Sequence, residues 1–359
     1  MRSAASTRAT ATAWVASLSP WPEGFGLERM HALLDRLGHP ERSFDSIHIV
    51  GSNGKSTATR TIAELLRADG RRAGAYTSPH VSGWAERIWV DGAEADFEQA
   101  IARVRSDAQA VDATQFETLT AAAFAEFADQ EIEAAAIEAG LGGRLDATNV
   151  VAAPIVLLTN VTREHTDVLG ETTEQIAREK LAVAHAARIV VLPDNTFTHL
   201  VPQGRVVLGG AAEAASAYLG TSPQNEVDVR LPGRLERRGE KPFELWDGAH
   251  NAAGAEYLVD RLDRTDFVLC VSILADKDVD AMLALFRSVG HRLIATQSSS
   301  LRTLDAAHLA ARARTYFEHV ETSSDPHRAR LRAAELAGSD GALLVTGSLY
   351  LLADLSSSD

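Results

Sequence analysis

The sequence predicts an α/β protein of two domains, each built on a mainly parallel β-sheet. Apolar segments of strand length alternate with amphipathic segments of helix length along most of the 359 residues. This alternation is typical of parallel sheets covered by helices. The chain is also long for one typical domain. Two successive α/β units therefore explain the pattern best.

The elements of the first domain can be placed in order. A short helix is expected near residues 12–18, after a frayed start. The spacing of Ile62, Leu65 and Leu66 predicts a helix with one buried face over residues 58–68. Thr172 and Gln175 form a potential capping box for a helix that runs through Lys180. A further helix is expected at residues 118–127, and strands at residues 47–50, 73–77, 134–138, 155–159 and 188–192.

The composition shifts toward small and polar residues between about residues 200 and 231, and the periodic signal weakens there. We place the domain boundary between residues 225 and 226, which gives domains of residues 1–225 and 226–359. In the second domain we expect strands at residues 243–246, 267–273, 293–296 and 342–346, with helices at residues 252–262, 279–288 and 304–314. The second domain is thus predicted to be a smaller, Rossmann-like α/β unit.

Composition limits the possible functions. The net charge of −14 argues against nucleic acid as the main partner, because a phosphate backbone requires a basic surface. The single cysteine, Cys270, lies in an apolar run, so we interpret it as a core residue of a cytoplasmic protein. No apolar run approaches the length of a membrane span, so a membrane partner is not expected.

A glycine-rich sequence lies between the first strong strand and the first strong helix. It reads GSNGKST and comprises Gly51, Ser52, Asn53, Gly54, Lys55, Ser56 and Thr57. Such a loop points backbone N–H groups at a phosphate, and its lysine reaches the β and γ phosphates. Ser56 or Thr57 could place a hydroxyl on Mg²⁺. The first domain is therefore predicted to be P-loop NTPase-like and to bind ATP or GTP, although a plain turn would also use these glycines.

Polar residues follow three predicted strands, where open α/β sheets bind their ligands. Ser78 follows the strand at residues 73–77, Glu138 ends the strand at 134–138, and His165 follows the strand at 155–159. Together a hydroxyl, a carboxylate and an imidazole could hold Mg²⁺ between ATP phosphates. Taken singly, each has a structural alternative: a turn cap, an ion pair or a packed histidine.

Several blocks along the chain have distinctive sequences. The most specific are EAGLGGRLDATN at residues 138–149 and DGAHN at residues 247–251; the others are GSNGKST, the region of residues 76–88, TQFE at 114–117, IAREK at 176–180, LPGR at 231–234, LADKD at 274–278 and TGSLY at 346–350. Together they resemble the folylpolyglutamate synthase and dihydrofolate synthase branch of the Mur ligase superfamily. The blocks occur in the family's order and span nearly the whole chain. The resemblance implies an ATP-dependent ligase that joins a pteroate or folate carboxylate to L-glutamate through an acyl phosphate.

The resemblance also implies residue roles. Lys55 would grip the β and γ phosphates, while Ser78, Glu138 and His165 would bind Mg²⁺. Lys180 matches a lysine that the family carbamylates to hold a second Mg²⁺; its alternative is a helical lysine paired with nearby acids. Arg234, Asp247 and His250 would come from the second domain to act on the nucleotide, and Asp247, His250, Lys55 and Lys180 would be catalytic. Thr114, Phe116 and Asp146 match positions near the pterin-bearing substrate, and Phe116 could equally be core.

Three departures from the family pattern leave alternatives open. The loop reads GKST where the family has GKGS, the residues after Lys180 differ, and the segment between Lys180 and Arg234 is short. The resemblance therefore does not assign the adenine-side contacts or the far edge of the first domain. A related ligase with another acceptor and a non-catalytic ATP-binding paralogue remain alternatives. The choice between dihydrofolate synthase, folylpolyglutamate synthase and both stays open, and the resemblance favours a monomer.

Overall fold

The computed structural model describes residues 10–20, 24 and 26–357. The chain divides into two compact units, which are described separately. The first comprises Met1–Pro79 and Trp84–Val229, and the second comprises His80–Gly83 and Arg230–Asp359. The sequence alone placed a boundary four residues earlier in the chain, between residues 225 and 226. The expected frayed start, residues 1–9, lies outside the described part of the chain.

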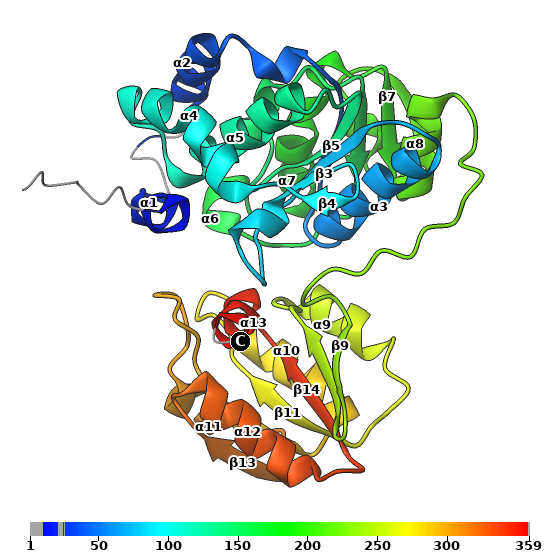
Figure 1. The fold of residues 1–359 in the computed structure, drawn as a ribbon. Helices are drawn as coiled ribbons and strands as arrows, with labels where there is room; N and C mark the ends of the chain where they lie inside the picture. Colours follow the sequence, from blue (N-terminus) through cyan, green and yellow to red (C-terminus); the bar gives the residue numbers. More distant parts are fainter. Residues whose placement is uncertain (1–9, 21–23, 25, 358–359) are drawn as a thin grey trace, which may run out of the picture. The chain divides into compact units, whose positions relative to one another are not determined.

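The first unit is built on an eight-stranded sheet (Figure 1). Its strands are ordered β4-β3-β2-β5-β1-β6-β7-β8. The strands β2, β5, β1, β6, β7 and β8 run parallel to one another. Only β3 and β4 are antiparallel to their neighbours. The bounds are β1 Asp45–Val50, β2 Ala73–Tyr76, β3 Ile88–Val90, β4 Ala93–Glu94, β5 Ala134–Glu138, β6 Ile155–Leu158, β7 Ile189–Leu192 and β8 Arg205–Leu208.

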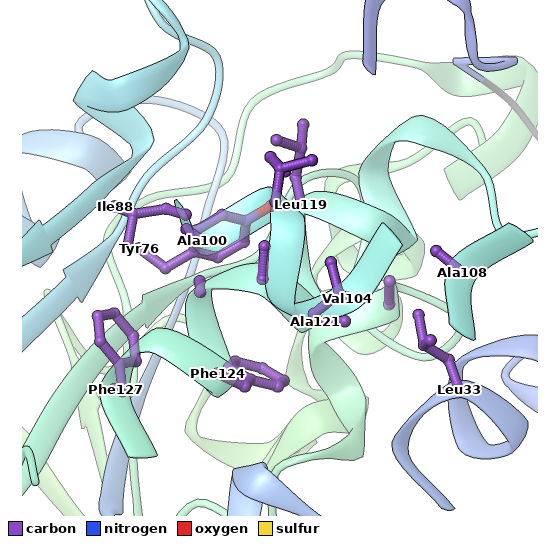
Figure 2. Packing of buried hydrophobic residues seen from close by; sticks show 14 of the residues in the cluster. Leu33, Tyr76, Ile88, Ala100, Val104, Ala108, Leu119, Ala121, Phe124 and Phe127 are labelled. Atoms are coloured by element: carbon purple, nitrogen blue, oxygen red, sulfur yellow. The ribbon is translucent and has the colours of Figure 1, made fainter. Parts of the chain in front are cut away.

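Side-chain alternation along the central strands gives this sheet two buried faces. Ile47 and Ile49 of β1 pack with residues of α3 (Lys55–Ala68) and α8 (Ala211–Leu219). On the other face Tyr76, Phe124 and Phe127 form part of a second core cluster (Figure 2). That cluster joins α1 (Ala11–Ser17), α2 (Glu28–Leu37), α4 (Phe97–Ala110) and α5 (Gln115–Asp129). The two layers hold the central strands rigidly, so their carboxyl ends offer a fixed platform.

The second unit contains a six-stranded sheet of order β13-β12-β11-β14-β10-β9, in which only β9 is antiparallel to its neighbour. The strands are β9 Glu236–Glu240, β10 Phe243–Asp247, β11 Phe267–Val271, β12 Arg292–Ala295, β13 His319–Thr322 and β14 Ala342–Thr346; the helices are α9 Ala252–Val259, α10 Val279–Phe286, α11 Ala306–Ala313, α12 Pro326–Ala337 and α13 Leu349–Ser356. Cys270 is buried in the core of this unit, as predicted.

The strands and helices expected from the sequence are present within a few residues of their predicted bounds. The capping box of α7 (Thr173–Leu181) is also present, with Thr172 and Gln175 as its members. The structure adds elements that the sequence did not reveal, among them α2, α4, β13, α12 and α13.

The weak signal near residues 200–231 was misleading, because β8 and α8 lie there. Strand β8 is an edge strand with little burial, and α8 is rich in alanine, so neither shows a strong hydrophobic contrast. The far edge of the first sheet is formed by β8, which pairs with β7. No helix among the described residues is both long and apolar enough to cross a membrane.

Candidate active site

The glycine-rich loop at residues 51–57 connects β1 to α3 and is held by the chain that follows β6. The Ser52 N–H donates to the carbonyl oxygen of Asn160 at 3.0 Å, and the Asn53 N–H donates to Asn160 Oδ1 at 2.8 Å. The Thr159 hydroxyl donates to the Asn53 carbonyl at 2.7 Å. These bonds hold the first half of the loop in place. The second half of the loop lies at the start of α3.

Two glycines of this loop have backbone conformations that other residues rarely adopt. Gly51 has φ of +150°, and a Cβ atom there would lie 1.9 Å from Thr159 Oγ1. Gly54 has φ of +79° and immediately precedes α3, which begins at Lys55. The N-terminal turn of a 14-residue helix presents N–H groups without intrahelical partners and the positive end of the helix dipole. The loop therefore has the backbone geometry of a phosphate site.

Glu138 lies beside the loop because β5 neighbours β1 in the sheet and Ile49 is paired with Glu138. Its side chain is 1% exposed. The Ser56 hydroxyl donates to Glu138 Oε1 at 3.2 Å, and the backbone N–H of Ser78 donates to Oε2 at 3.0 Å. Thr57, in contrast, is exposed. Of the two candidate hydroxyls, the structure thus places that of Ser56 beside the carboxylate.

Lys180, near the end of α7, reaches the same loop. Its Nζ atom donates to the Gly51 carbonyl at 2.8 Å and to Glu164 Oε1 at 3.1 Å. The residue is 2% exposed. Burial, together with the nearby charge of Lys55, lowers the pKa of Lys180 to about 8, against the opposing effect of Glu164. The amine is therefore poised to lose its proton near neutral pH.

Glu164 completes this cluster, although no sequence motif predicted a role for it. Although burial opposes ionisation, the charges of Lys180 and Lys55 and a hydrogen bond with Ser52 lower the pKa of its carboxyl group. Lys55 itself lies at the first position of α3, and its Nζ atom is 3.4 Å from the Ser52 carbonyl. Two carboxylates, Glu138 and Glu164, and two lysines, Lys55 and Lys180, thus lie around the loop.

The segment after Glu138 is folded around the carboxylate of Asp146. The Leu141 N–H donates to Asp146 Oδ2 at 2.8 Å, and the Thr148 N–H donates to Oδ1 at 3.0 Å. The Thr148 hydroxyl also donates to Oδ1, at 2.5 Å. Burial raises the pKa of Asp146, while these donors oppose the change. Asp146 therefore stabilises the conformation of the loop at residues 139–149.

Phe116 and Thr114 lie at the start of α5, and the ring of Phe116 lies against this loop. A Cβ atom on Gly140 would lie 2.6 Å from Phe116 Cζ, so the ring packs directly on the loop backbone. Phe116 is partly buried, and its ring centroid is 6.1 Å from that of Tyr76. Thr114 and Glu117 form a reciprocal capping box at the helix start. Phe116 is thus at the margin of the core, and Thr114 has a structural role.

In the second unit, the loop after β10 packs on the loop that contains Arg234. Asp247 is buried at the end of β10; its Oδ1 accepts from the Ala249 N–H at 2.9 Å and its Oδ2 from the Leu235 N–H at 2.8 Å. Burial raises the pKa of Asp247. The Nδ1 atom of His250 lies 2.8 Å from the Gly248 carbonyl, which can only accept, so Nδ1 carries a hydrogen. Arg234, Asp247 and His250 therefore belong to one local structure.

A second polar region of this unit lies at the carboxyl ends of β11, β12 and β14. Thr296 Oγ1, Ser298 Oγ and Thr346 Oγ1 are buried and lack a hydrogen-bond partner within the protein. Buried hydroxyls without a partner are uncommon and call for an explanation such as a ligand or water. Lys277, whose side chain is 9% exposed, lies on the loop after β11 and pairs with Asp276 at 3.2 Å. No sequence motif predicted a role for these hydroxyls.

Comparison with known proteins identifies the family. Residues 49–203 match the model of the Mur ligase middle domain, and residues 233–349 match that of the Mur ligase, glutamate ligase domain. The dihydrofolate synthase/folylpolyglutamate synthase of Mycobacterium tuberculosis is 33% identical, over 85% of this chain and 82% of the relative. The chain belongs to the dihydrofolate synthase/folylpolyglutamate synthase family. The resemblance inferred from the sequence blocks is thereby confirmed.

Solved structures of this family share both α/β domains with the chain. The folylpolyglutamate synthase of Mycobacterium tuberculosis complexed with ADP has a TM-score of 0.87 and 28% identity, covering 96% of each chain. The bifunctional folylpolyglutamate synthase/dihydrofolate synthase of Yersinia pestis, with Mn, AMPPNP and L-glutamate bound, has a TM-score of 0.84 and 25% identity, covering 98% of each chain. The predicted fold class is confirmed by these structures.

Within this Mur ligase fold, the predicted site residues of the first unit divide into two groups. Lys55, Ser56, Glu138 and Lys180 gather around the phosphate loop, and Ser78 joins them through its backbone N–H. His165 begins α6 (Thr166–Leu169) in the left-handed conformation, one residue after Glu164. Phe116 and Asp146 form the second group, at the loop after β5, while Thr114 caps α5 together with Glu117. The missed residue, Glu164, directly precedes the predicted site residue His165, and this position next to a predicted ligand was the signal that could have revealed it.

Proposed function

We propose that this protein is an ATP-dependent ligase that forms an amide bond between a pteroate or folate carboxylate and L-glutamate. The observation that carries the proposal is the convergence of Lys55, Glu138 and Lys180 on a phosphate loop, in a chain of the dihydrofolate synthase/folylpolyglutamate synthase family. A carboxylate oxygen of the acceptor attacks the γ phosphorus, and ADP leaves. The amine of glutamate then attacks the acyl carbon, phosphate leaves, and the nitrogen loses a proton.

The residues around the loop fit a nucleotide with a divalent cation. The N–H groups at the start of α3, from Lys55 to Thr57, would bind phosphate oxygens. Gly51 and Gly54 would supply the backbone torsions of the loop, and the bonds of Ser52 and Asn53 to Asn160 would hold it in place. A bound Mg²⁺ would neutralise phosphate charge. The hard oxygen donors Glu138 and Ser56 are already side by side, and hard oxygen donors are what Mg²⁺ prefers. Ser78 and His165 complete the proposed set.

Lys180 would contribute a second negative ligand after carbamylation. The neutral amine attacks the carbon of CO₂ and loses a proton, so a cation becomes an anion. Its lowered pKa supports this reaction, because only the unprotonated amine is nucleophilic. A second metal ion would then be bound with the help of Lys180.

In the second unit, we assign Arg234, Asp247 and His250 to the nucleotide and the phosphoryl step by family likeness. We assign L-glutamate to the hydroxyl region defined by Thr296, Ser298 and Thr346. Hydroxyl groups can both donate to a carboxylate and accept from an ammonium group. Thr346→Val should raise the KM for L-glutamate without changing the affinity for ATP.

Thr114, Phe116 and Asp146 are assigned to the acceptor. Phe116 offers a partly buried ring beside the loop that Asp146 organises, which suits a planar pterin or benzoyl group. We further propose that the enzyme acts as a monomer in the cytoplasm; a monomeric mass in light scattering at micromolar concentration is the expected result, and a dimer would refute that part.

The test is a substrate panel with purified protein and MgATP. Dihydropteroate, tetrahydrofolate and a UDP-muramyl acceptor are each supplied with L-glutamate, and phosphate release and product mass are measured. The proposal predicts glutamate-dependent turnover with dihydropteroate, tetrahydrofolate or both. Turnover with the muramyl acceptor alone would identify a different ligase. Nucleotide binding without stimulated hydrolysis by any acceptor would identify a non-catalytic paralogue, and both outcomes contradict the proposal.

A further inference from the structure

A buried histidine lies beneath the loop after β5, and no step of the proposed reaction uses it. His48 occupies the middle of β1, opposite Ile137 of β5 and Val156 of β6, and is fully buried. Because side chains alternate along a strand, it points away from the α3 face where Ile47 and Ile49 pack. Burial, with a smaller contribution from His185, lowers the pKa of His48 to about 3. The imidazole is therefore neutral at physiological pH.

The single hydrogen bond recorded for this ring determines its tautomer. His48 Nε2 lies 2.8 Å from Thr148 Oγ1. The Thr148 hydroxyl has one hydrogen, which it donates to Asp146 Oδ1 at 2.5 Å. Thr148 Oγ1 must therefore accept from His48, so Nε2 carries the ring hydrogen. The Nδ1 atom is left as a buried acceptor without a partner.

An unpartnered buried acceptor destabilises the fold, and an aliphatic residue at position 48 would avoid that cost. What the imidazole provides instead is a directed donor to Thr148. The chain of donors runs from His48 through Thr148 to Asp146, and the other oxygen of Asp146 holds the Leu141 N–H. Leu141 follows Gly140, on which the ring of Phe116 packs.

We propose that His48 is a positioning residue for the acceptor substrate: its Nε2–H, acting through Thr148, orients the Asp146 carboxylate and with it the loop at residues 139–149. The inference rests on the proposed role of Asp146 and Phe116 at the acceptor. It assigns His48 no contact with ATP, glutamate or the reacting atoms. Loss of the donor should therefore affect acceptor binding more than turnover.

The kinetic test compares three variants with tetrahydrofolate as the acceptor. His48→Leu removes the donor and should raise the KM for tetrahydrofolate about three- to tenfold, the effect of losing one neutral hydrogen bond. The KM for ATP and kcat should stay within about twofold. His48→Gln, which keeps an N–H near the Nε2 position, should restore most of the loss. Val156→Ala is the matched control, because it opens a cavity beside His48 without touching the relay.

A second measurement does not depend on activity. In ¹⁵N-labelled wild-type protein, the His48 ring should show a protonated Nε2 and a bare Nδ1 from pH 5 to 8. Amide exchange at Leu141 should be faster in His48→Leu than in wild type or Val156→Ala. A hydrogen on Nδ1, unchanged exchange at Leu141, or an equal rise in KM for Val156→Ala would overturn the inference. If the wild type shows no ligase activity, the proposed function fails, and the ring and exchange data still decide whether the relay exists.

Discussion

Lys180 gives the sharpest prediction, because its amine should be free to react near neutral pH. An ordinary lysine of pKa 10.5 has about one neutral amine in a thousand at pH 7.5, whereas a pKa of about 8 makes roughly a quarter neutral. The reactive fraction is thus raised by about two hundredfold. Carbamate formation at Lys180 should therefore proceed at physiological pH, where exposed lysines of the chain scarcely react.

The assay uses ¹³C-bicarbonate and NMR detection of the carbamate carbon between pH 6.5 and 9. The signal should grow with the neutral fraction of the amine, with a midpoint near pH 8. Lys180→Met keeps the length and apolar stem of the side chain but lacks the amine, so its spectrum should lack the signal. A signal that persists in Lys180→Met, or a wild-type amine that titrates near 10.5, would refute the reasoning.

The same pKa predicts how stability depends on pH in protein kept free of CO₂. The unfolded chain binds the Lys180 proton more tightly than the folded state, so stability rises as the pH increases from about 8 to 10.5. The difference between these values corresponds to about 3 kcal/mol at 1.36 kcal/mol per pH unit. Urea unfolding of the wild type relative to Lys180→Met should reveal this rise, which a flat difference would contradict.

Three further predictions concern the phosphate loop and the second unit. Ser56→Ala should reduce turnover about tenfold at limiting Mg²⁺ because the hydroxyl beside Glu138 is lost, whereas Thr57→Ala, at an exposed position, should stay within about twofold; a Mg²⁺ titration separates them. Gly51→Ala should abolish nucleotide binding in calorimetry, because its Cβ would clash with Thr159. Asp247→Asn should lower the unfolding free energy by about 2 kcal/mol in urea, since an amide can accept only one of the two N–H bonds well; an unchanged midpoint would show that the two bonds contribute little.

Much of the fold was predictable because its central strands are buried on both faces. Strands β5 and β14 lie at the residues predicted from their apolar runs. The missed elements had weaker signals: β8 is a half-exposed edge strand, and β13 is mostly exposed. Packing against a neighbour, rather than local hydrophobicity, determines such elements.

The candidate site was predictable where it depends on a motif and unpredictable where it depends on distant contacts. The sequence by itself determined the phosphate loop, because only certain residues satisfy its torsions and charge, and it pointed to Glu138 at the end of a strand; Lys180 was predicted through the family resemblance. Only the tertiary structure shows that Ser56, and not Thr57, lies beside Glu138. It also places Glu164 against Lys180, and it links His48 to Asp146 through Thr148. These contacts join residues up to 100 positions apart. They arise from strand order in the sheet, which brings such residues together and which no local pattern encodes.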